Sequence, residues 1–153
     1  MTKLSYNVIS ALQGCTLVTA ESCTGGGIGA ALTAIPGSSA VYKGGIISYS
    51  NELKIQLLGV SADTLNDKGA VSLEVAKQMA EGARKKLCAD YAVSVTGLAG
   101  PEGDSSGNPV GTVFIGFSDA NRSIVRHCLF QGGREKIRTQ AITAALEMIL
   151  SEI

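Results

Sequence analysis

The stretch "CTLVTAESCTGGGIGAALTAI", residues 15–35, decides the fold class of this chain. Its first six residues are small, apolar or β-branched, which is typical of a buried strand. Three consecutive glycines follow, and residues 28–35 then carry a helical pattern that stops at Pro36-Gly37. A buried strand that leads through a glycine turn into a helix indicates an α/β fold.

The rest of the chain continues this alternation of helices and strands. Further helices are predicted at residues 4–12, 51–58, 73–87 and 134–150, and further strands at residues 40–50, 90–97, 110–118 and 123–131. The pair Gly44-Gly45 is expected to break the strand at residues 40–50 in two. Residues 119–122 read as a hairpin turn, and a hairpin joins antiparallel strands. The pattern therefore predicts an α/β sandwich with a mixed sheet, folded as one domain over residues 1–153.

The composition excludes several classes of function. Thirteen basic and 13 acidic residues give a formal net charge of zero, which argues against a general binder of nucleic acid or of anionic membranes. Low net charge favours self-association, so we expect a homo-oligomer, with a dimer favoured. The four cysteines lack C-x-x-C spacing and residues 1–6 show no secretory leader, so reduced thiols in a cytoplasmic protein are expected. No His, Cys or carboxylate cluster has the spacing of metal ligands, and no apolar run reaches the roughly 18 residues of a membrane span.

The glycine stretch is compatible with more than one kind of site. Gly25, Gly27 and Ala30 fit the G-x-G-x-x-[GA] fingerprint of dinucleotide binding. In that fingerprint the first glycine directly follows the strand, whereas Glu21–Thr24 intervene here, and no acidic residue ends the next strand. A P-loop is excluded, because no Gly-Lys-[Ser/Thr] follows the glycines. The plainest alternative is that a hydroxyl of this turn caps the helix while the glycines allow close packing.

Ser22 lies directly after the buried strand and just before the N-terminus of a helix. Backbone N–H groups and the positive end of the helix dipole surround a hydroxyl in this position, and they stabilise an oxyanion that forms beside it. The expected donors are those of Thr24, Gly25 and Gly26. Cys23 is the one thiol that could replace the serine, because a cysteine near a helix N-terminus can be reactive. The arrangement favours acyl-transfer chemistry with Ser22 as the nucleophile.

A serine nucleophile needs a base, and two residue types could supply it. The only histidine, His127, lies in an expected strand, where a lone histidine is more often structural. Lysine becomes a base when burial or a nearby cation lowers its pKa. The stretch "SYSNELK" places Tyr49 at a strand end and Lys54 inside the following helix. If the two strand ends are neighbours, Tyr49 and Lys54 converge on Ser22.

Six blocks of sequence carry a family resemblance. They are "TAESCTGG" (19–26), "PGSS" (36–39), "SYSNELK" (48–54), "GAVS" (69–72), "TGLAGPEG" (96–103) and "PVGTV" (109–113). In order, and over essentially the whole chain, they resemble the C-terminal domain of the CinA competence/damage-inducible family, whose stand-alone members include nicotinamide-nucleotide amidases. The resemblance implies a three-layer α/β/α fold and hydrolysis of nicotinamide mononucleotide to nicotinate mononucleotide and ammonia, without metal or cofactor. It also implies a serine–lysine site with a tyrosine, and by position these roles fall on Ser22, Lys54 and Tyr49.

The chain departs from the family pattern at three positions. Family members often read G-P-x-G-G and carry a lysine before P-V-G, where this chain has Asp104 and Asn108. The later F-x-G-D-R block reads "FQGGR", with Gly133 in place of the acid. These changes bear on the identity of the substrate more than on the nucleophile. Two alternatives therefore stay open: a nucleotide-binding module without catalysis, and a serine–lysine hydrolase that acts on another amide or ester.

A mononucleotide substrate also requires a site for its phosphate dianion. The loop "TGLAGPEG" could face an anion with its backbone N–H groups, and its expected substrate contacts are Thr96, near the carboxamide, with Gly97 and Gly100. The stretch "GGREKIR" places Arg134 and Arg138 four residues apart at the start of the last helix, where the helix dipole also favours anions. One of these arginines is expected to help bind the phosphate, within one chain or across a subunit boundary.

Overall fold

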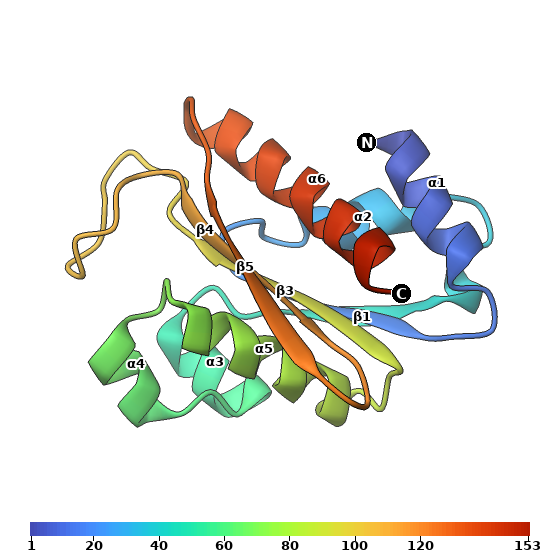
Figure 1. The fold of residues 1–153 in the computed structure, drawn as a ribbon, viewed down its shortest axis with the longest axis horizontal. Coiled ribbons are helices and arrows are strands. Elements are labelled where there is room, and N and C mark those ends of the chain that lie inside the picture. Colours follow the sequence, from blue (N-terminus) through green and yellow to red (C-terminus); the bar gives the residue numbers. More distant parts are fainter.

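The computed structural model describes residues 1–153, and its helices cover both faces of one five-stranded sheet (Figure 1). The strands are β1 (Leu17–Glu21), β2 (Tyr42–Ile47), β3 (Tyr91–Gly97), β4 (Thr112–Ser118) and β5 (Ser123–Leu129). The helices are α1 (Thr2–Ala11), α2 (Gly27–Thr33), α3 (Asn51–Leu58), α4 (Ala62–Lys68), α5 (Leu73–Lys86) and α6 (Arg134–Glu152).

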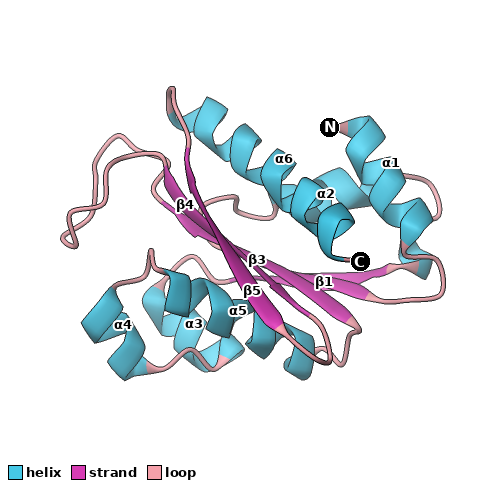
Figure 2. Cartoon of the chain, viewed as in Figure 1, coloured by secondary structure: helices cyan, strands magenta, loops and turns pink.

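The sheet is mixed, as the sequence predicts. Its strand order is β2-β1-β3-β4-β5, and Figure 2 shows these strands between the helices. β1 pairs in parallel with both β2 and β3, whereas β4 is antiparallel to β3 and to β5. The turn between β4 and β5 is the hairpin expected at residues 119–122.

Two separate apolar clusters hold the helices against the sheet. On one face, α1, α2 and α6 contribute to a cluster of 22 buried residues that includes Leu32 and Leu146. On the other face, α3, α4 and α5 contribute to a cluster of 10 buried residues that includes Leu58 and Met79. Burial of these side chains supplies the main favourable free energy of folding. The three-layer α/β/α sandwich is thereby confirmed.

The carboxyl ends of β1, β2 and β3 meet at one edge of the sheet, because these strands are parallel. Ser22 donates its N–H to Val95 O at 3.0 Å, and Ser48 donates its N–H to Glu21 O at 2.9 Å. From this edge β1 leads to α2 on one face, while its neighbour β2 leads to α3 on the other. A crevice opens where neighbouring strands diverge in this way, and it is where α/β proteins bind ligands.

Strand β2 differs from its prediction, because it runs through Gly44-Gly45 without a break. The pairing of β1 with β2 instead shifts register after Leu17. A Cβ atom added at Gly45 would overlap Thr19 Oγ1 on the adjacent strand. Glycine at this position therefore permits close approach of two strands and does not end one.

Helix α4 was not predicted from the sequence. Its residues are mostly polar, and Leu65 is its only buried residue, so it carries almost no helical hydrophobic period. The signal that does exist is at its start, where Ser61 Oγ accepts a hydrogen bond from the Thr64 N–H at 3.3 Å.

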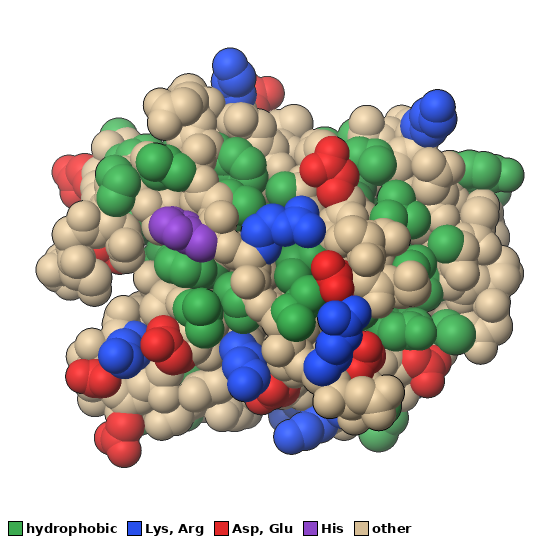
Figure 3. Space-filling view, viewed as in Figure 1, with side chains coloured by type: hydrophobic (Ala, Val, Ile, Leu, Met, Phe, Trp, Pro, Cys, Tyr) green, Lys and Arg blue, Asp and Glu red, His purple; other side chains and the backbone are tan.

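The molecular surface has mixed charge. On the face in Figure 3, basic and acidic side chains are interspersed and do not gather into one patch. No helix combines the length and the apolar character that a membrane crossing requires.

Candidate active site

Ser22 and Lys54 form a buried pair at the carboxyl edge of the sheet. Lys54 Nζ donates a hydrogen bond to Ser22 Oγ at 3.0 Å and another to Ser48 O at 2.8 Å. Only 2% of Lys54 is exposed, and this burial lowers its pKa from 10.5 to about 8. A lysine with such a pKa is partly neutral near pH 8, and a neutral amine can accept the proton of an adjacent hydroxyl.

Helix α3 positions Lys54 beside Ser22. Ser50 Oγ caps the helix by accepting a hydrogen bond from the Leu53 N–H at 3.2 Å, and Gly59 ends it with a φ of 66°. Lys54 and Leu58, four residues apart, are the two buried residues of this helix. Leu58 packs into the apolar cluster and so orients the face from which the lysine reaches Ser22.

A pocket of about 280 Å³ opens beside the pair. The expected site residues that line it are Ser22, Tyr49, Lys54, Thr96, Gly97, Gly100 and Arg134. The expected residues that do not line it are Thr24, Gly25, Gly26 and Arg138.

Tyr49 and Arg134 meet at the rim of the pocket. Arg134 Nη2 donates to the Tyr49 hydroxyl at 3.0 Å, and its Nη1 donates to Gly100 O at 2.7 Å. The guanidinium thus connects the loop after β2 to the loop after β3. The Tyr49 hydroxyl thus bonds to Arg134 and forms no hydrogen bond with Ser22 or Lys54. Only the Tyr49 carbonyl oxygen approaches Lys54 Nζ, at 3.5 Å.

Thr96 forms part of the pocket wall and also holds a neighbouring segment. Its Oγ1 donates to Ala70 O at 2.8 Å, and the residue is 1% exposed. The hydroxyl proton is therefore already engaged, and Thr96 can offer a substrate only its oxygen lone pairs.

The family departures in the loop after β3 lie outside the pocket lining. Asp104 Oδ1 accepts the N–H of Asn108 at 3.0 Å, and Asn108 Nδ2 donates to Asp104 Oδ2 at 3.0 Å and to Val71 O at 3.1 Å. These two residues fasten the loop to itself and to the segment before α5. Gly133 is the N-cap of α6, with no atom within 4 Å of a Cβ placed there.

The N-terminus of α2 is already occupied by a carboxylate of the chain itself. Glu21, which is 1% exposed, accepts hydrogen bonds from Thr24 Oγ1 at 2.7 Å and from the N–H groups of Gly26, Ile28 and Gly29 at 3.0, 3.0 and 2.9 Å. These are the donors that a phosphate would need at this helix. The glycine stretch is therefore neither a phosphate cradle nor a dinucleotide fingerprint. Sequence analysis missed this role, because Glu21 ends β1 and is separated from the first residue of α2 by the whole turn at residues 22–26.

The glycines serve the turn and the packing. Gly25 and Gly26 have φ angles of 59° and 95°, which favour glycine, and a Cβ at Gly27 would lie 2.5 Å from Ile142 Cδ1 on α6. The Gly25 N–H donates to Ser22 O at 3.0 Å, and the Gly26 N–H to Glu21. Both groups, expected as oxyanion donors, are thus engaged within the protein.

The alternative nucleophile and the alternative base are poorly placed. Burial raises the pKa of the Cys23 thiol to about 11, so it is protonated at neutral pH. His127 lies exposed on β5, at the far edge of the sheet from β1 and β2, and stacks on Phe114 with ring centroids 4.6 Å apart. No group of three His, Cys, Asp or Glu side chains could hold a metal ion.

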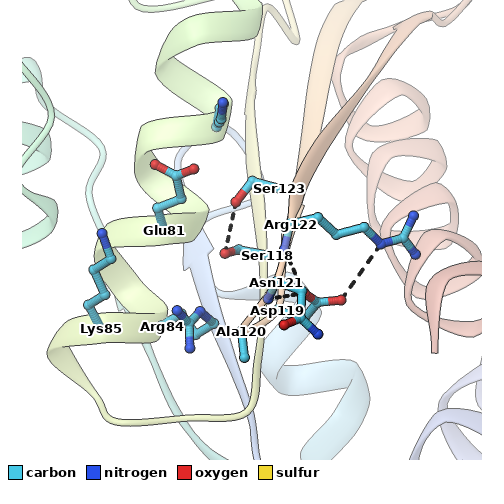
Figure 4. A pocket seen from close by; sticks show the side chains of 10 residues that line it. Glu81, Arg84, Lys85, Ser118, Asp119, Ala120, Asn121, Arg122 and Ser123 are labelled. Carbon is cyan, nitrogen blue, oxygen red and sulfur yellow. Dashed lines mark hydrogen bonds and ion pairs between the residues drawn. The ribbon is translucent and has the colours of Figure 1, made fainter.

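A second hollow, of about 430 Å³, lies between α5 and the β4–β5 turn (Figure 4). Asp119 in its lining accepts the N–H groups of Asn121 and Arg122 at 2.7 and 2.8 Å and so stabilises the turn. Ser118 and Ser123 in its lining bond to each other at 3.0 Å. This hollow holds no hydroxyl paired with a base, and the Ser22 pocket remains the candidate active site.

The fold and the site define an α/β protein with a buried serine–lysine pair at the carboxyl ends of two neighbouring parallel strands. The chain matches the CinA C-terminal domain over residues 1–153, and it belongs to this family. It is 47% identical over 150 residues to the nicotinamide-nucleotide amidohydrolase PncC of Escherichia coli, which covers 96% of this chain and 91% of that protein.

Longer relatives and solved structures agree with this assignment. A putative competence-damage inducible protein of Halothermothrix orenii is 53% identical over 127 residues, which are 82% of this chain and 31% of that protein. The chain thus spans about a third of the length of this relative. The crystal structure of the competence/damage inducible protein CihA from Agrobacterium tumefaciens has a TM-score of 0.95 at 42% identity, covering 98% of this chain and 93% of that one.

Proposed function

We propose that this protein is an amidohydrolase that converts nicotinamide mononucleotide to nicotinate mononucleotide and ammonia. The observation that carries the proposal is the buried Lys54 Nζ, 3.0 Å from Ser22 Oγ beside a 280 Å³ pocket. The name of the E. coli relative supports the choice of substrate.

The reaction begins with proton transfer from Ser22 to Lys54. Ser22 Oγ attacks the carboxamide carbon, its proton passes to neutral Lys54 Nζ, and a tetrahedral oxyanion forms. When the C–N bond breaks, Lys54 returns the proton to the nitrogen, which leaves as ammonia. Water then attacks the acyl-enzyme, with Lys54 again taking the proton. When the bond to Ser22 Oγ breaks, Lys54 returns this proton to Oγ, and the acid is released as its carboxylate.

The N–H groups of Cys23 and of Thr24, the latter an expected oxyanion donor, both lack a partner, and that of Cys23 is better placed because Cys23 lines the pocket and Thr24 does not. The carbonyl of Ser22 accepts the Gly25 N–H, and because a trans peptide is planar, the N–H of Cys23 points the opposite way. This N–H donates to no other residue, and Cys23 lines the pocket. The N–H of the residue after the nucleophile has the same task in other serine hydrolases. Loss of one such donor costs about 100-fold or more in rate.

Release of ammonia and of acid from a panel of substrates tests the proposal. The panel comprises nicotinamide mononucleotide, nicotinamide riboside, free nicotinamide and simple esters, each with the wild type and with Ser22→Ala. We expect turnover of the mononucleotide by the wild type alone, with binding retained in Ser22→Ala. Turnover of a different amide or ester in place of the mononucleotide would identify another substrate. Binding of the mononucleotide without turnover by the wild type would identify a nucleotide-binding module.

A further inference from the structure

The turn that carries the proposed nucleophile is held at nearly every peptide group. Ser22 O accepts the Gly25 N–H at 3.0 Å, and Thr24 O accepts the Gly27 N–H at 3.1 Å. The peptide group between Cys23 and Thr24 has no backbone partner. Two side chains add contacts to the turn: Arg138 from α6, and Glu21 from the end of β1 directly before it.

Arg138 holds the turn by its carbonyl groups. It extends from α6, and its Nε donates to Cys23 O at 3.1 Å while its Nη2 donates to Thr24 O at 3.1 Å. Arg138 forms no ion pair, so its charge is directed to these two carbonyls. A planar guanidinium binds two successive carbonyls through separate nitrogen atoms in a fixed geometry, whereas a lysine has only one nitrogen on a flexible stem.

Glu21 holds the same turn by its donor groups. Its carboxylate accepts the Thr24 hydroxyl and the Gly26 N–H, together with two N–H groups of the first turn of α2. The four donors and the helix dipole stabilise its charge, although the residue is buried.

We propose that Glu21 and Arg138 are positioning residues, which hold this turn from its donor side and its carbonyl side. In this role they keep Ser22 Oγ against Lys54 Nζ and leave the Cys23 N–H free for the oxyanion. The inference rests on the proposed function, and it gives Arg138 a task other than phosphate binding. A misplacement of about 1 Å at reacting groups can cost about 100-fold in rate.

Steady-state kinetics of Arg138→Met, Arg138→Lys and Glu21→Gln test this inference. We expect kcat for nicotinamide mononucleotide to fall about 10-fold or more in Arg138→Met, with KM within about 2-fold, because oxyanion binding acts only in the transition state. Arg138→Lys should lie between Arg138→Met and the wild type. Glu21→Gln, which turns one acceptor into a donor, should also lower kcat. The matched control is Lys43→Met, since Lys43 Nζ likewise donates to two carbonyls, those of Leu87 and Cys88, away from the pocket.

Each alternative has its own signature. A raised KM for the mononucleotide with unchanged kcat in Arg138→Met would assign this arginine to the phosphate and overturn the inference. An equal loss of kcat in Lys43→Met would show that the loss in Arg138→Met reflects only a general loss of stability, and it would overturn the inference. Hydrogen exchange of residues 22–29 gives a readout without turnover, and we expect faster exchange in Arg138→Met than in Lys43→Met. If the wild type hydrolyses no substrate, the proposed function fails, and unchanged exchange in Arg138→Met would separately overturn the positioning role.

Discussion

Lys54 is the residue on which the proposed chemistry depends, and its surroundings favour its neutral form. Its Nζ contacts the Ser22 hydroxyl and the carbonyl oxygens of Ser48 and Tyr49, which are all uncharged. Lys54 forms no ion pair with a carboxylate. No opposite charge at hydrogen-bond distance therefore offsets the loss of hydration, and its pKa falls to about 8.

The rate of hydrolysis should follow the ionisation of Lys54. Because the neutral amine is the proposed base, kcat/KM should rise as pH increases through about 8 and then level off. Lys54→Arg should be nearly inactive, since a guanidinium stays protonated throughout this range. Measurement of kcat/KM between about pH 6 and pH 10 checks both expectations. His127→Ala should keep the wild-type profile, and substantial turnover by Lys54→Arg would remove the lysine from the mechanism.

Arg134 is the second residue whose role can be tested separately. It is the only cation besides Lys54 in the pocket lining, and it forms no ion pair, since its partners are the Tyr49 hydroxyl and Gly100 O. Arg134→Ala should raise KM for nicotinamide mononucleotide about 10-fold or more and leave kinetics with the phosphate-free riboside unchanged. Measurement of kcat and KM for both substrates, with the wild type and with Arg134→Ala, checks this expectation. Equal effects on both would show that the arginine does not bind the phosphate.

At the scale of elements, helix α3 depends on one glycine of its neighbour α5. Gly82 lies inside α5, where a glycine lowers helix stability by about 1 kcal/mol relative to alanine. Its presence there is therefore explained by packing. A Cβ added at Gly82 would overlap the carbonyl oxygen of Leu58 at the end of α3. The glycine thus lets α3, which carries Lys54, pack closely on α5.

Gly82→Ala should therefore destabilise the protein in spite of its better helix propensity. We expect a loss of about 2 kcal/mol or more in the free energy of unfolding, because backbone must move to relieve the overlap. Since α3 would shift, kcat should fall as well. Urea unfolding and kcat, measured together, check this, with Lys77→Ala on the exposed face of α5 as the control. A variant as stable as Lys77→Ala would mean that the two helices tolerate wider spacing.

The elements themselves were largely predictable from the sequence. Helix α4 was missed because it carries almost no hydrophobic period, and the error in β2 has a different cause. The bounds of α3, residues 51–58, were predicted exactly as found because its cap and glycine end are local signals. Strand β2 was misjudged at Gly44-Gly45 because the reason for Gly45 is Thr19 on another strand. A contact between elements leaves no periodic trace in the local sequence.

At the scale of the molecule, sheet topology assembles the site. Ser22 and Lys54 are 32 residues apart, and the sequence could suggest their meeting only on the condition that β1 and β2 are neighbours. The contact of Arg138 with Cys23 spans 115 residues, and i, i+4 spacing on α6 gave no means to predict it. The sequence showed which residue types lie at the strand ends, whereas the contacts of these residues could be identified only from the fold.

The buried lysine also sets a stability cost for the whole molecule. Its pKa is lower in the folded state than the 10.5 of an exposed lysine, so between about pH 8 and pH 10.5 the unfolded chain binds more protons. Stability therefore rises with pH across that window, and below about pH 8 the full cost is present. At about 1.4 kcal/mol per pKa unit, that cost is about 3 kcal/mol.

Lys54→Met should accordingly be inactive but more stable than the wild type below about pH 8. The gain should be about 1–2 kcal/mol, since the variant also loses the hydrogen bond to Ser48 O, and it should shrink as pH rises from 8 to 10. Urea unfolding of both proteins at about pH 6.5, 8 and 9.5 measures the difference, and Lys77→Met should show no pH-dependent change. A Lys54→Met protein less stable than wild type at every pH would show that the hydrogen bonds of Nζ outweigh its burial. The pH at which the stability difference begins to shrink should also match the pH at which kcat/KM of the wild type rises, because both report the ionisation of Lys54 in the free protein.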